Sequence, residues 1–335
     1  MTGKTIGWGM VGASTIARDW MVDAIRSNAD SRIEAVCSGD VSRAKALAAE
    51  KGISDAYGSM VELLENPKID AVYISSANER HLYEALAAAK AGIHVLCEKP
   101  LALEPNEAEE MVESCRRAGV VLATNHHLRD LESHRAIKRL IDEGAIGTVT
   151  SIRLSHADRL PDELQTWRHF KNGIGSGAVF DLMVHDADLL RYYLGRNPIR
   201  VTASAATSGD GPKDIEDSVQ SMWEFSGDAQ VQCHETFNIA AAPHGVEVRG
   251  SKGSILGVEI MSQAPGGAVT LRTAAGEEKI PLENKITCHR GVADFVGAIQ
   301  GAGRPSATGE DGVWSLKLAR AVALSAASGQ PVAIG

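Results

Sequence analysis

The chain has 335 residues and a mass of 35.5 kDa, which is more than one hydrophobic core usually serves, so its length predicts about two domains. Its 44% hydrophobic and 23% charged residues are typical of a globular protein and argue against a disordered, collagen-like or coiled-coil chain. The net charge of −9 excludes an overall positive field that would attract nucleic acid or anionic lipid. Any phosphate must therefore be bound at a local site.

No apolar run approaches the ~18 residues that a membrane span needs, and the N-terminal stretch Ile6–Ala13 is broken by glycines and lacks a cleavage pattern. A cytoplasmic location is the default expectation. The cysteines are odd in number and have no C-x-x-C spacing, which argues against a disulfide framework or a zinc cluster. We expect them to be reduced packing residues: Cys37, Cys97, Cys115, Cys233 and Cys288.

The first part of the chain alternates short β-branched runs with longer amphipathic segments, a pattern typical of consecutive βαβ units and a parallel sheet. The expected strands are Thr5–Val11, Arg32–Cys37, Asp70–Ser75, His94–Cys97 and Val120–Thr124. The expected helices are Ile16–Asn28, Ser42–Glu50, His81–Ala91 and Pro105–Ala118. Gly92 and Gly119 stand where helix C-caps belong.

After one more predicted helix, Ser133–Glu143, the pattern changes to longer alternating strands, which predicts an antiparallel second sheet. The strands expected there are Val149–His156, Ser218–Phe225 and Gln230–Phe237. We therefore expect a Rossmann-like α/β domain over residues 1–125 and a second α/β domain over residues 126–335. The helical segment Gly309–Ser328 can pack back on either domain.

A glycine turn follows the first predicted strand: Gly9-Met10-Val11-Gly12-Ala13-Ser14-Thr15-Ile16-Ala17. A strand that enters a tight turn and then a helix presents free backbone N–H groups and the positive helix end to a pyrophosphate. Ser14 occupies the position of the middle glycine in the usual G-x-G-x-x-G/A pattern, which weakens the motif. The alternative is an ordinary packing corner between a strand and a helix.

The end of the second predicted strand bears on cofactor choice. An NAD enzyme places an acid there to bind the ribose hydroxyls, whereas an NADP enzyme needs a neutral or basic pocket for the 2′-phosphate. Ser38 takes the position of the acid, and Arg43 lies one helical turn into the next helix, so NADP is favoured. Asp40 argues for NAD if the loop turns it inward.

Cys97-Glu98-Lys99-Pro100 follows at the carboxyl end of a predicted strand, the edge at which open α/β sheets bind ligands. A lysine is usually only a solvated surface charge, but this position favours a functional one. Pro100 restricts the conformation of Lys99, and a cis bond between them would aim the lysine into the cleft.

A predicted helix over Gly177–Leu194 is apolar around most of its circumference and should be buried. Asp181, His185, Asp188 and Tyr192 nevertheless form one polar stripe along it. Buried polar groups must be satisfied, so the stripe either forms an internal hydrogen-bond network or lines a ligand cavity. A metal site is not expected, because no additional ligand is marked.

These features, with the segment Thr124-Asn125-His126-His127-Leu128-Arg129, resemble the glucose–fructose oxidoreductase, inositol dehydrogenase and rhizopine-catabolism (Gfo/Idh/MocA) family over nearly the whole chain. Cys97-Glu98-Lys99-Pro100-Leu101-Ala102, Val184-His185-Asp186-Ala187-Asp188 and the segment from Ser306 to Leu316 are similar to the branch that reduces 1,5-anhydro-D-fructose. In that branch serine is itself the middle residue of the dinucleotide turn. The resemblance implies a Rossmann domain beside a domain built on a largely antiparallel open sheet, whose open face often joins copies of the chain into homo-oligomers.

The resemblance also assigns site residues. It implies that Lys99, Asp181 and His185 form a catalytic trio. It further implies that the cofactor is bound by Gly12, Ser14, Thr15, Ile16, Ser38, Arg43, Ser76, Asn78, His81, Glu98, Lys99, Asn125, Trp167 and Arg168.

The chemistry can be argued from the residue types. A ketone that accepts hydride from a dihydronicotinamide develops charge on its oxygen, so the site needs a cation or a proton donor there. Lys99 and His185 are the candidates, and Asp181 would orient the imidazole; which of the two donates the proton is open. The leading hypothesis is an NADPH-dependent reductase of a sugar-derived ketone. The alternatives are an NAD(P)-dependent polyol or inositol dehydrogenase and a non-catalytic dinucleotide sensor.

Overall fold

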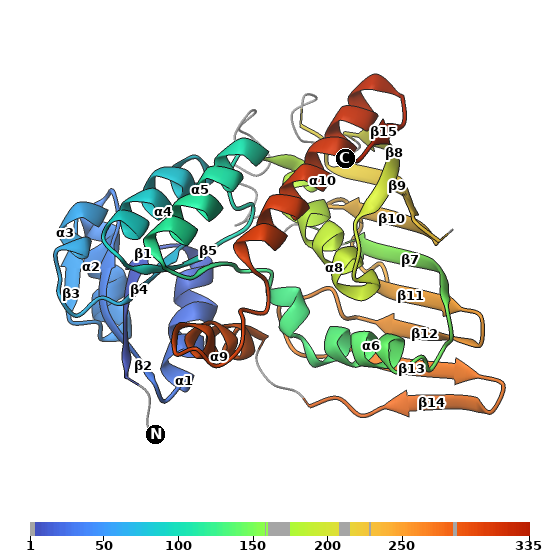
Figure 1. Ribbon diagram of the computed structural model, residues 1–335, viewed down its shortest axis with the longest axis horizontal. Coiled ribbons are helices and arrows are strands. Elements are labelled where there is room, and N and C mark those ends of the chain that lie inside the picture. Colours follow the sequence, from blue (N-terminus) through green and yellow to red (C-terminus); the bar gives the residue numbers. More distant parts are fainter. Residues whose placement is uncertain (1–3, 158, 160–174, 208–214, 228, 284–286) are drawn as a thin grey trace. The chain divides into compact units, whose positions relative to one another are not determined.

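The computed structural model describes residues 4–157, 159, 175–207, 215–227, 229–283 and 287–335. Its contacts divide the chain into two compact units. The first comprises residues 1–127 and 288–314, and the second comprises residues 128–287 and 315–335. Each unit is built on one sheet, and together the two sheets confirm the expected α/β class (Figure 1).

The first unit contains a six-stranded parallel sheet in the Rossmann order β3-β2-β1-β4-β5-β6. Its strands are β1 (Ile6–Val11), β2 (Ser31–Cys37), β3 (Asp55–Tyr57), β4 (Ala71–Ile74), β5 (His94–Cys97) and β6 (Leu122–Thr124). β1, β2, β4 and β5 match the sequence expectation to within one residue at each end, and β6 begins two residues later than expected. The short β3 and the helix α3 (Met60–Leu64) were not expected.

The helices of the first unit start and stop at residues with a defined capping role. The side chain of Asp40 caps α2 (Val41–Lys51), and Gly52 ends it in the left-handed conformation. A capping box of Glu104 and Glu107 starts α5 (Pro105–Ala118). The other helical segments that follow the strands of this unit are η1 (Ala17–Met21), α1 (Val22–Ser27), η2 (Asn78–Arg80) and α4 (His81–Lys90), which lies beside α5 (Figure 1).

The segment Cys288–Trp314 belongs to the first unit by its contacts, whereas the sequence placed it after a single boundary at residue 125. The physical reason is the apolar face of α9 (Thr287–Ile299), which packs into the first core. The ring of Phe295 lies 5.3 Å from that of Trp8, centroid to centroid. The start of α10 (Gly309–Ser328), up to Trp314, belongs to the first unit by its contacts, and the rest of this helix belongs to the second unit.

The second unit contains a nine-stranded sheet in the order β14-β13-β12-β11-β7-β10-β9-β8-β15. Neighbouring strands are antiparallel except for the central pair, in which β7 and β10 run parallel. The strands are β7 (Val149–Ala157), β8 (Pro198–Ala206), β9 (Ser218–Phe225), β10 (Gln230–Thr236), β11 (Gly245–Gly250), β12 (Gly253–Val258), β13 (Ala268–Thr273), β14 (Gly276–Ile280) and β15 (Val332–Ala333).

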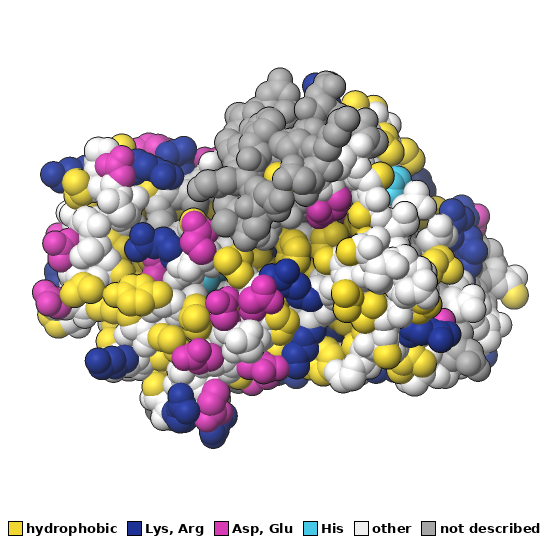
Figure 2. All heavy atoms as spheres, turned by 90° about the horizontal axis from the view of Figure 1, so that it is seen from above, with side chains coloured by type: hydrophobic (Ala, Val, Ile, Leu, Met, Phe, Trp, Pro, Cys, Tyr) yellow, Lys and Arg dark blue, Asp and Glu magenta, His cyan; other side chains and the backbone are white. Residues whose placement is uncertain are grey.

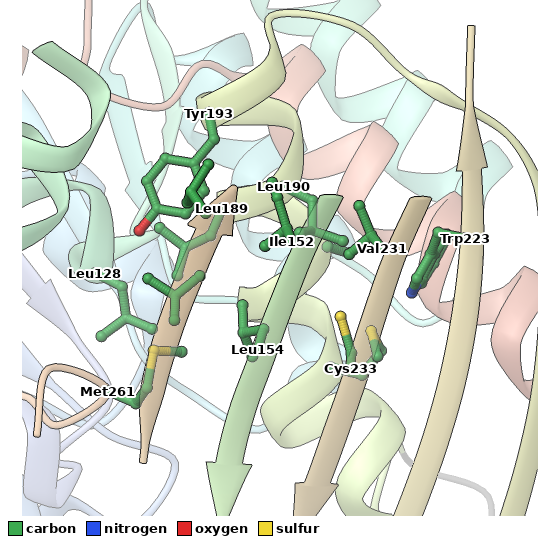
Figure 3. Packing of buried hydrophobic residues seen from close by; sticks show 14 of the residues in the cluster. Leu128, Ile152, Leu154, Leu189, Leu190, Tyr193, Trp223, Val231, Cys233 and Met261 are labelled. Carbon is green, nitrogen blue, oxygen red and sulfur yellow. The ribbon is translucent and has the colours of Figure 1, made fainter. Parts of the chain in front are cut away.

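One face of this sheet carries the core of the second unit. It is covered by η3 (His127–Asp130), α6 (Glu132–Asp142), η5 (Val179–Met183), α8 (Val184–Leu194) and the later part of α10 (Figure 1). Figure 3 shows Leu190 of α8 lying over Ile152 of β7, next to Val231 of β10. The helix predicted over Gly177–Leu194 is therefore buried along its apolar side, as its composition requires.

Polar side chains of the other face line a hollow of about 340 Å³, among them Arg153, Gln232 and Glu247. On the described part of the face drawn in Figure 2, basic and acidic side chains are intermixed and form no extended basic surface. Within the described residues, no helix is long and apolar enough to cross a membrane.

Candidate active site

The turn after β1 needs a glycine at position 12. Gly12 has a φ of 101°, a conformation that disfavours any side chain. A Cβ atom placed there would lie 2.8 Å from the backbone of Ser75 and Ser76, which follow β4. The loops after β1 and β4 therefore approach each other closely at the carboxyl edge of the sheet, where α/β sheets bind dinucleotides.

Ser14 starts the helix that follows this turn. Its hydroxyl accepts a hydrogen bond from the Ala17 N–H at 3.1 Å and donates one to the Ser75 hydroxyl at 2.8 Å. The N–H groups of Thr15 and Ile16, in the first turn of the helix, have no partner in the part of the chain that the structure describes. Unpaired N–H groups at a helix start suit a pyrophosphate, so these residues fit a dinucleotide.

The residues expected to choose between NAD and NADP lie at the ends of β1 and β2. Arg43, on α2, donates a hydrogen bond to the Ala13 carbonyl at 2.9 Å, which brings its guanidinium to the glycine turn. Ser38 follows β2 and is partly exposed. The Asp40 carboxylate accepts hydrogen bonds from the N–H and the hydroxyl of Ser42, and these bonds lower its pKa. Asp40 is thus occupied as a helix cap.

The loop after β4 is tied to the loop after β5 through a histidine. His81 is fully buried and hydrogen-bonds to the Ser76 carbonyl at 3.3 Å and to the Pro100 carbonyl at 3.0 Å. Burial lowers the pKa of His81, while the two carbonyl contacts oppose the fall; a neutral imidazole has one N–H and donates to only one of these carbonyls at a time. Asn78, also expected at the cofactor, lies buried in the same loop. These residues shape the edge of the sheet.

Two buried side chains hold the carboxylate of Glu98, which follows β5. Its carboxylate accepts hydrogen bonds from the Tyr73 hydroxyl at 2.6 Å and the Asn125 amide at 2.5 Å. Burial raises the pKa of Glu98, while these two bonds and the nearby charge of Lys99 oppose the rise. The sequence predicted Glu98 and Asn125 as cofactor residues, and the structure brings them together as a pair that holds the end of β5.

Lys99 follows Glu98 at the carboxyl end of β5 and is half-buried. The peptide bond between Lys99 and Pro100 is cis, the alternative considered from the sequence. The loop that carries Lys99 is fixed by Glu98 on one side and by the contact of Pro100 with His81 on the other. The first unit thus presents the lysine from a rigid support.

In the second unit, a glutamate defines where the helix with the polar stripe begins. The Val179 N–H donates to the Glu216 carboxylate at 3.1 Å, and the Ala178 N–H donates to the Glu216 carbonyl at 3.1 Å. Gly177 has a φ of 87°, and a Cβ atom there would lie 2.2 Å from the same carboxylate. Gly177 therefore makes room for Glu216.

The stripe itself divides into two parts. Asp181 is partly exposed and lies in the π-helical turns of η5, and His185 is buried in the first turn of α8. Further along, Arg129 forms two hydrogen bonds of 2.6 Å with the carboxylate of Asp188, and its guanidinium lies 5.3 Å from the ring centroid of Tyr192. The later half of the stripe is therefore a buried ion-pair network, the structural alternative.

The sequence did not single out a second polar cluster under α8. His156 of β7 and Glu235 of β10 are opposite each other in the parallel register, and both are buried. The Nδ1 atom of His156 lies 3.0 Å from the carboxylate of Asp186, the residue after His185. The alternating pattern of both strands indicated which side chains face inward, but only the pairing of β7 with β10 brings these two together.

Two predicted cofactor residues, Trp167 and Arg168, lie outside the described residues. Among the residues that are described, no group of three His, Cys, Asp or Glu side chains is placed to hold a metal ion. The described cysteines are buried, and burial raises the pKa of Cys37 to about 12.

Comparison with known proteins bears directly on these features. Residues 6–126 match the model of the GFO/IDH/MocA oxidoreductase family, NAD-binding Rossmann fold. Residues 134–256 match the model of the GFO/IDH/MocA C-terminal domain. The chain belongs to the Gfo/Idh/MocA family. It is therefore an NAD(P)-dependent oxidoreductase that binds the dinucleotide through its Rossmann domain, as the sequence predicted.

One curated relative is similar over nearly the full length. The 1,5-anhydro-D-fructose reductase of Ensifer adhaerens is 45% identical over 327 residues, 98% of each chain. Two solved structures share the fold at lower identity. An aldose-aldose oxidoreductase from Caulobacter crescentus matches with a TM-score of 0.90 at 23% identity, over 99% of this chain and 100% of that one. A levoglucosan dehydrogenase in complex with NADH and levoglucosan matches with a TM-score of 0.88 at 24% identity, over 98% of this chain and 99% of that one.

Proposed function

We propose that the protein reduces a sugar-derived ketone with NADPH, in the manner of the reduction of 1,5-anhydro-D-fructose to 1,5-anhydro-D-mannitol. The observation that carries this proposal is the 45% identity with the Ensifer reductase over 98% of both chains. The structure of the dinucleotide turn supports it, since the Ser14 hydroxyl accepts a hydrogen bond from the Ala17 N–H at the start of the helix.

NADPH is the favoured cofactor because of the charges after β2. Arg43 brings a guanidinium to the glycine turn, and guanidinium groups bind phosphate through paired charge-assisted hydrogen bonds. The competing argument from Asp40 loses weight, since its carboxylate is engaged by Ser42 at the start of α2. A carboxylate used as a helix cap is not directed to a ribose.

In this proposal two residues serve the carbonyl oxygen of the substrate. The bound dihydronicotinamide supplies the hydride. Lys99 places a cation at the oxygen on which charge develops, and His185 holds a proton for it. Asp181, one turn earlier on the same helix, orients the imidazole. The trio and the expected cofactor residues are taken from the sequence and stand as part of this proposal.

The test is NADPH oxidation across a panel of carbonyl substrates. We expect turnover with 1,5-anhydro-D-fructose above that with other ketoses and inososes, and a higher catalytic efficiency with NADPH than with NADH. NAD(P)⁺ reduction by polyols and inositols, assayed in parallel, tests the opposite direction. Turnover confined to polyols would replace the proposal by a dehydrogenase, and equal efficiency with both cofactors would remove its cofactor part. The expected cytoplasmic location and the association of copies through the open sheet face stay predictions.

A further inference from the structure

A second arginine reaches the end of β2 from a different loop. Arg80 ends η2, the short helix after β4. Its Nη1 atom lies 3.6 Å from the position of a Cβ atom built on Gly39, two residues beyond the end of β2. Its charge also acts on Cys37, the last residue of β2, where it opposes the rise in the thiol pKa caused by burial.

The sheet order gives this contact its meaning. β1 lies between β2 and β4 in the sheet, and neighbouring strands are ~4.8 Å apart. A side chain that starts after β4 and ends beside the loop after β2 must therefore pass over the carboxyl end of β1. That end carries Gly12 and the helix start that suits a pyrophosphate. Arg80 thus lies over the half of the edge where β1 and β2 end.

The guanidinium is held in place by a buried carboxylate. The Nε atom of Arg80 donates to Glu84 at 2.9 Å, and the other oxygen of Glu84 accepts from the Ser76 hydroxyl at 2.5 Å. The Glu84 side chain is 3% exposed, whereas that of Arg80 is 51% exposed. The Nη atoms of Arg80 have no hydrogen-bond partner among the described residues. Their donors are oriented and available to a ligand.

We propose that Arg80 is a second guanidinium for the 2′-phosphate of NADPH, acting together with Arg43. The inference rests on the proposed preference for NADPH and names the residue that would strengthen it. Arg43 starts after β2 and hydrogen-bonds to the turn after β1, and Arg80 starts after β4 and lies beside Gly39 in the loop after β2. Two cations at these adjoining loops suit a dianionic group better than a neutral ribose.

The alternative role for Arg80 is to stack on the adenine ring, which NADH and NADPH share. The loop favours the phosphate, because Ser38 and Gly39 offer no acidic side chain to a ribose and the nearby Asp40 carboxylate is taken by Ser42. The two roles predict different ligand dependence, so a pair of fragments that differ only in the 2′-phosphate separates them.

The experiment is calorimetric titration of the full-length protein with adenosine 2′,5′-bisphosphate and with adenosine 5′-monophosphate. We expect the unmutated protein to bind the bisphosphate more tightly. Arg80→Met should weaken bisphosphate binding by about tenfold, the loss of one charge-assisted bond, and change monophosphate binding by less than about twofold. Arg80→Lys, which keeps the charge but loses the fork, should fall between the two proteins.

Three further variants complete the series. Arg43→Ala should show the same selective loss, and the double variant should bind both fragments about equally. Arg116→Met is the matched control. Arg116 lies on α5 of the same unit and is also paired with a glutamate one turn away, Glu113, at 2.8 Å. It should leave both affinities unchanged.

The outcomes separate the two proposals. If the unmutated protein binds both fragments equally, the preference for NADPH is wrong and the role of Arg80 falls with it. If it prefers the bisphosphate and Arg80→Met keeps that preference, only the inference on Arg80 is wrong. Equal weakening of both fragments would assign Arg80 to the adenine ring. Arg80→Met leaves Glu84 with one fewer donor, so the thermal unfolding of this variant is measured beside the titration. If the methionine variant is poorly folded, the affinities of Arg80→Lys for the two fragments decide the role of Arg80.

Discussion

Glu98 in the first unit and Glu235 in the second are both buried, yet their surroundings treat a negative charge in opposite ways. Two neutral donors, the Tyr73 hydroxyl and the Asn125 amide, point at Glu98. Neither oxygen of Glu235 has a donor within the described part of the chain, and its polar neighbour is the carboxylate of Asp186. Hydrogen-bond donors of the protein therefore stabilise a negative charge on Glu98, whereas the carboxylate of Asp186 disfavours a negative charge on Glu235.

The difference appears in the protonation of the two groups. Burial raises the pKa of both carboxyls, but the donors around Glu98 oppose the rise, whereas the charge of Asp186 adds to it at Glu235. Glu235 therefore has a pKa well above its usual range, which favours its protonated, neutral form. Burial alone does not decide if an acid is charged; the neighbouring groups do.

Each cluster also lies next to a candidate catalytic residue along the chain. Lys99 follows Glu98, and His185 precedes Asp186. If both clusters serve to support a reacting group, then removing the reacting groups should give the largest effect on turnover, and altering the clusters should mainly change stability. The predictions below test this order.

The largest expected effect is on turnover. Lys99→Met and His185→Ala should each lower single-turnover ketone reduction by about 10²–10⁴-fold, because each removes a group placed for the developing alkoxide. NADPH affinity should stay near normal. Lys90→Met, which removes a charge from the exposed end of α4, is the matched control and should leave turnover unchanged. Folded variants that turn over at the normal rate would contradict the catalytic assignment.

The next effect is on the stability of the first cluster. Glu98→Ala would leave the buried hydroxyl of Tyr73 and the buried amide of Asn125 without their acceptor, at a cost of about 2–5 kcal/mol in the free energy of unfolding. Both donors point at the same oxygen, so Glu98→Gln keeps an acceptor there and should restore most of the loss.

Urea unfolding measures this prediction. Glu110→Gln, at an exposed position on α5, controls for the loss of one negative charge and should change stability by less than about 0.5 kcal/mol. If Glu98→Ala and Glu98→Gln are equally destabilised, the charge of Glu98 matters and the shared oxygen does not.

The sequence predicted the features that depend on local pattern. The glycine turn at Gly12, the capped helix Pro105–Ala118 and the final helix Gly309–Ser328 were all expected, because capping residues and hydrophobic period are written in adjacent positions. The three-residue strand β3 was missed, since Asp55–Tyr57 is too short to show an alternation.

Features that depend on which strands become neighbours were beyond the sequence. The polar stripe on Gly177–Leu194 was visible by its spacing, but nothing in the spacing showed that Arg129 would pair with Asp188. The meeting of His156 with Glu235 likewise follows from the parallel pairing of β7 and β10, two strands far apart in the chain.

The smallest expected effect is the contribution of Glu235 to the pH dependence of the unfolding free energy. This effect tests the contrast between Glu98 and Glu235 most directly. The folded protein keeps the proton of this carboxyl to a higher pH than the unfolded chain, whose glutamates titrate at about 4.3. Between these two pKa values the unfolded state has released a proton that the native state retains. The stability contributed by neutral Glu235 is therefore present at acid pH and is lost as the pH rises from about 4.3 through the folded pKa.

Glu235→Gln cannot ionise, and its amide can donate a hydrogen bond to the neighbouring carboxylate of Asp186. The unfolding free energy of the variant should therefore gain on that of the unmutated protein by up to about 1.4 kcal/mol for each pH unit in this window. Urea unfolding of both proteins at successive pH values measures the difference, in which the contributions of all other titrating groups largely cancel. Glu278→Gln, at an exposed position on β14, should give a difference that does not change with pH. Parallel curves for Glu235→Gln would mean that Glu235 is ionised in the folded protein, and the contrast with Glu98 would disappear.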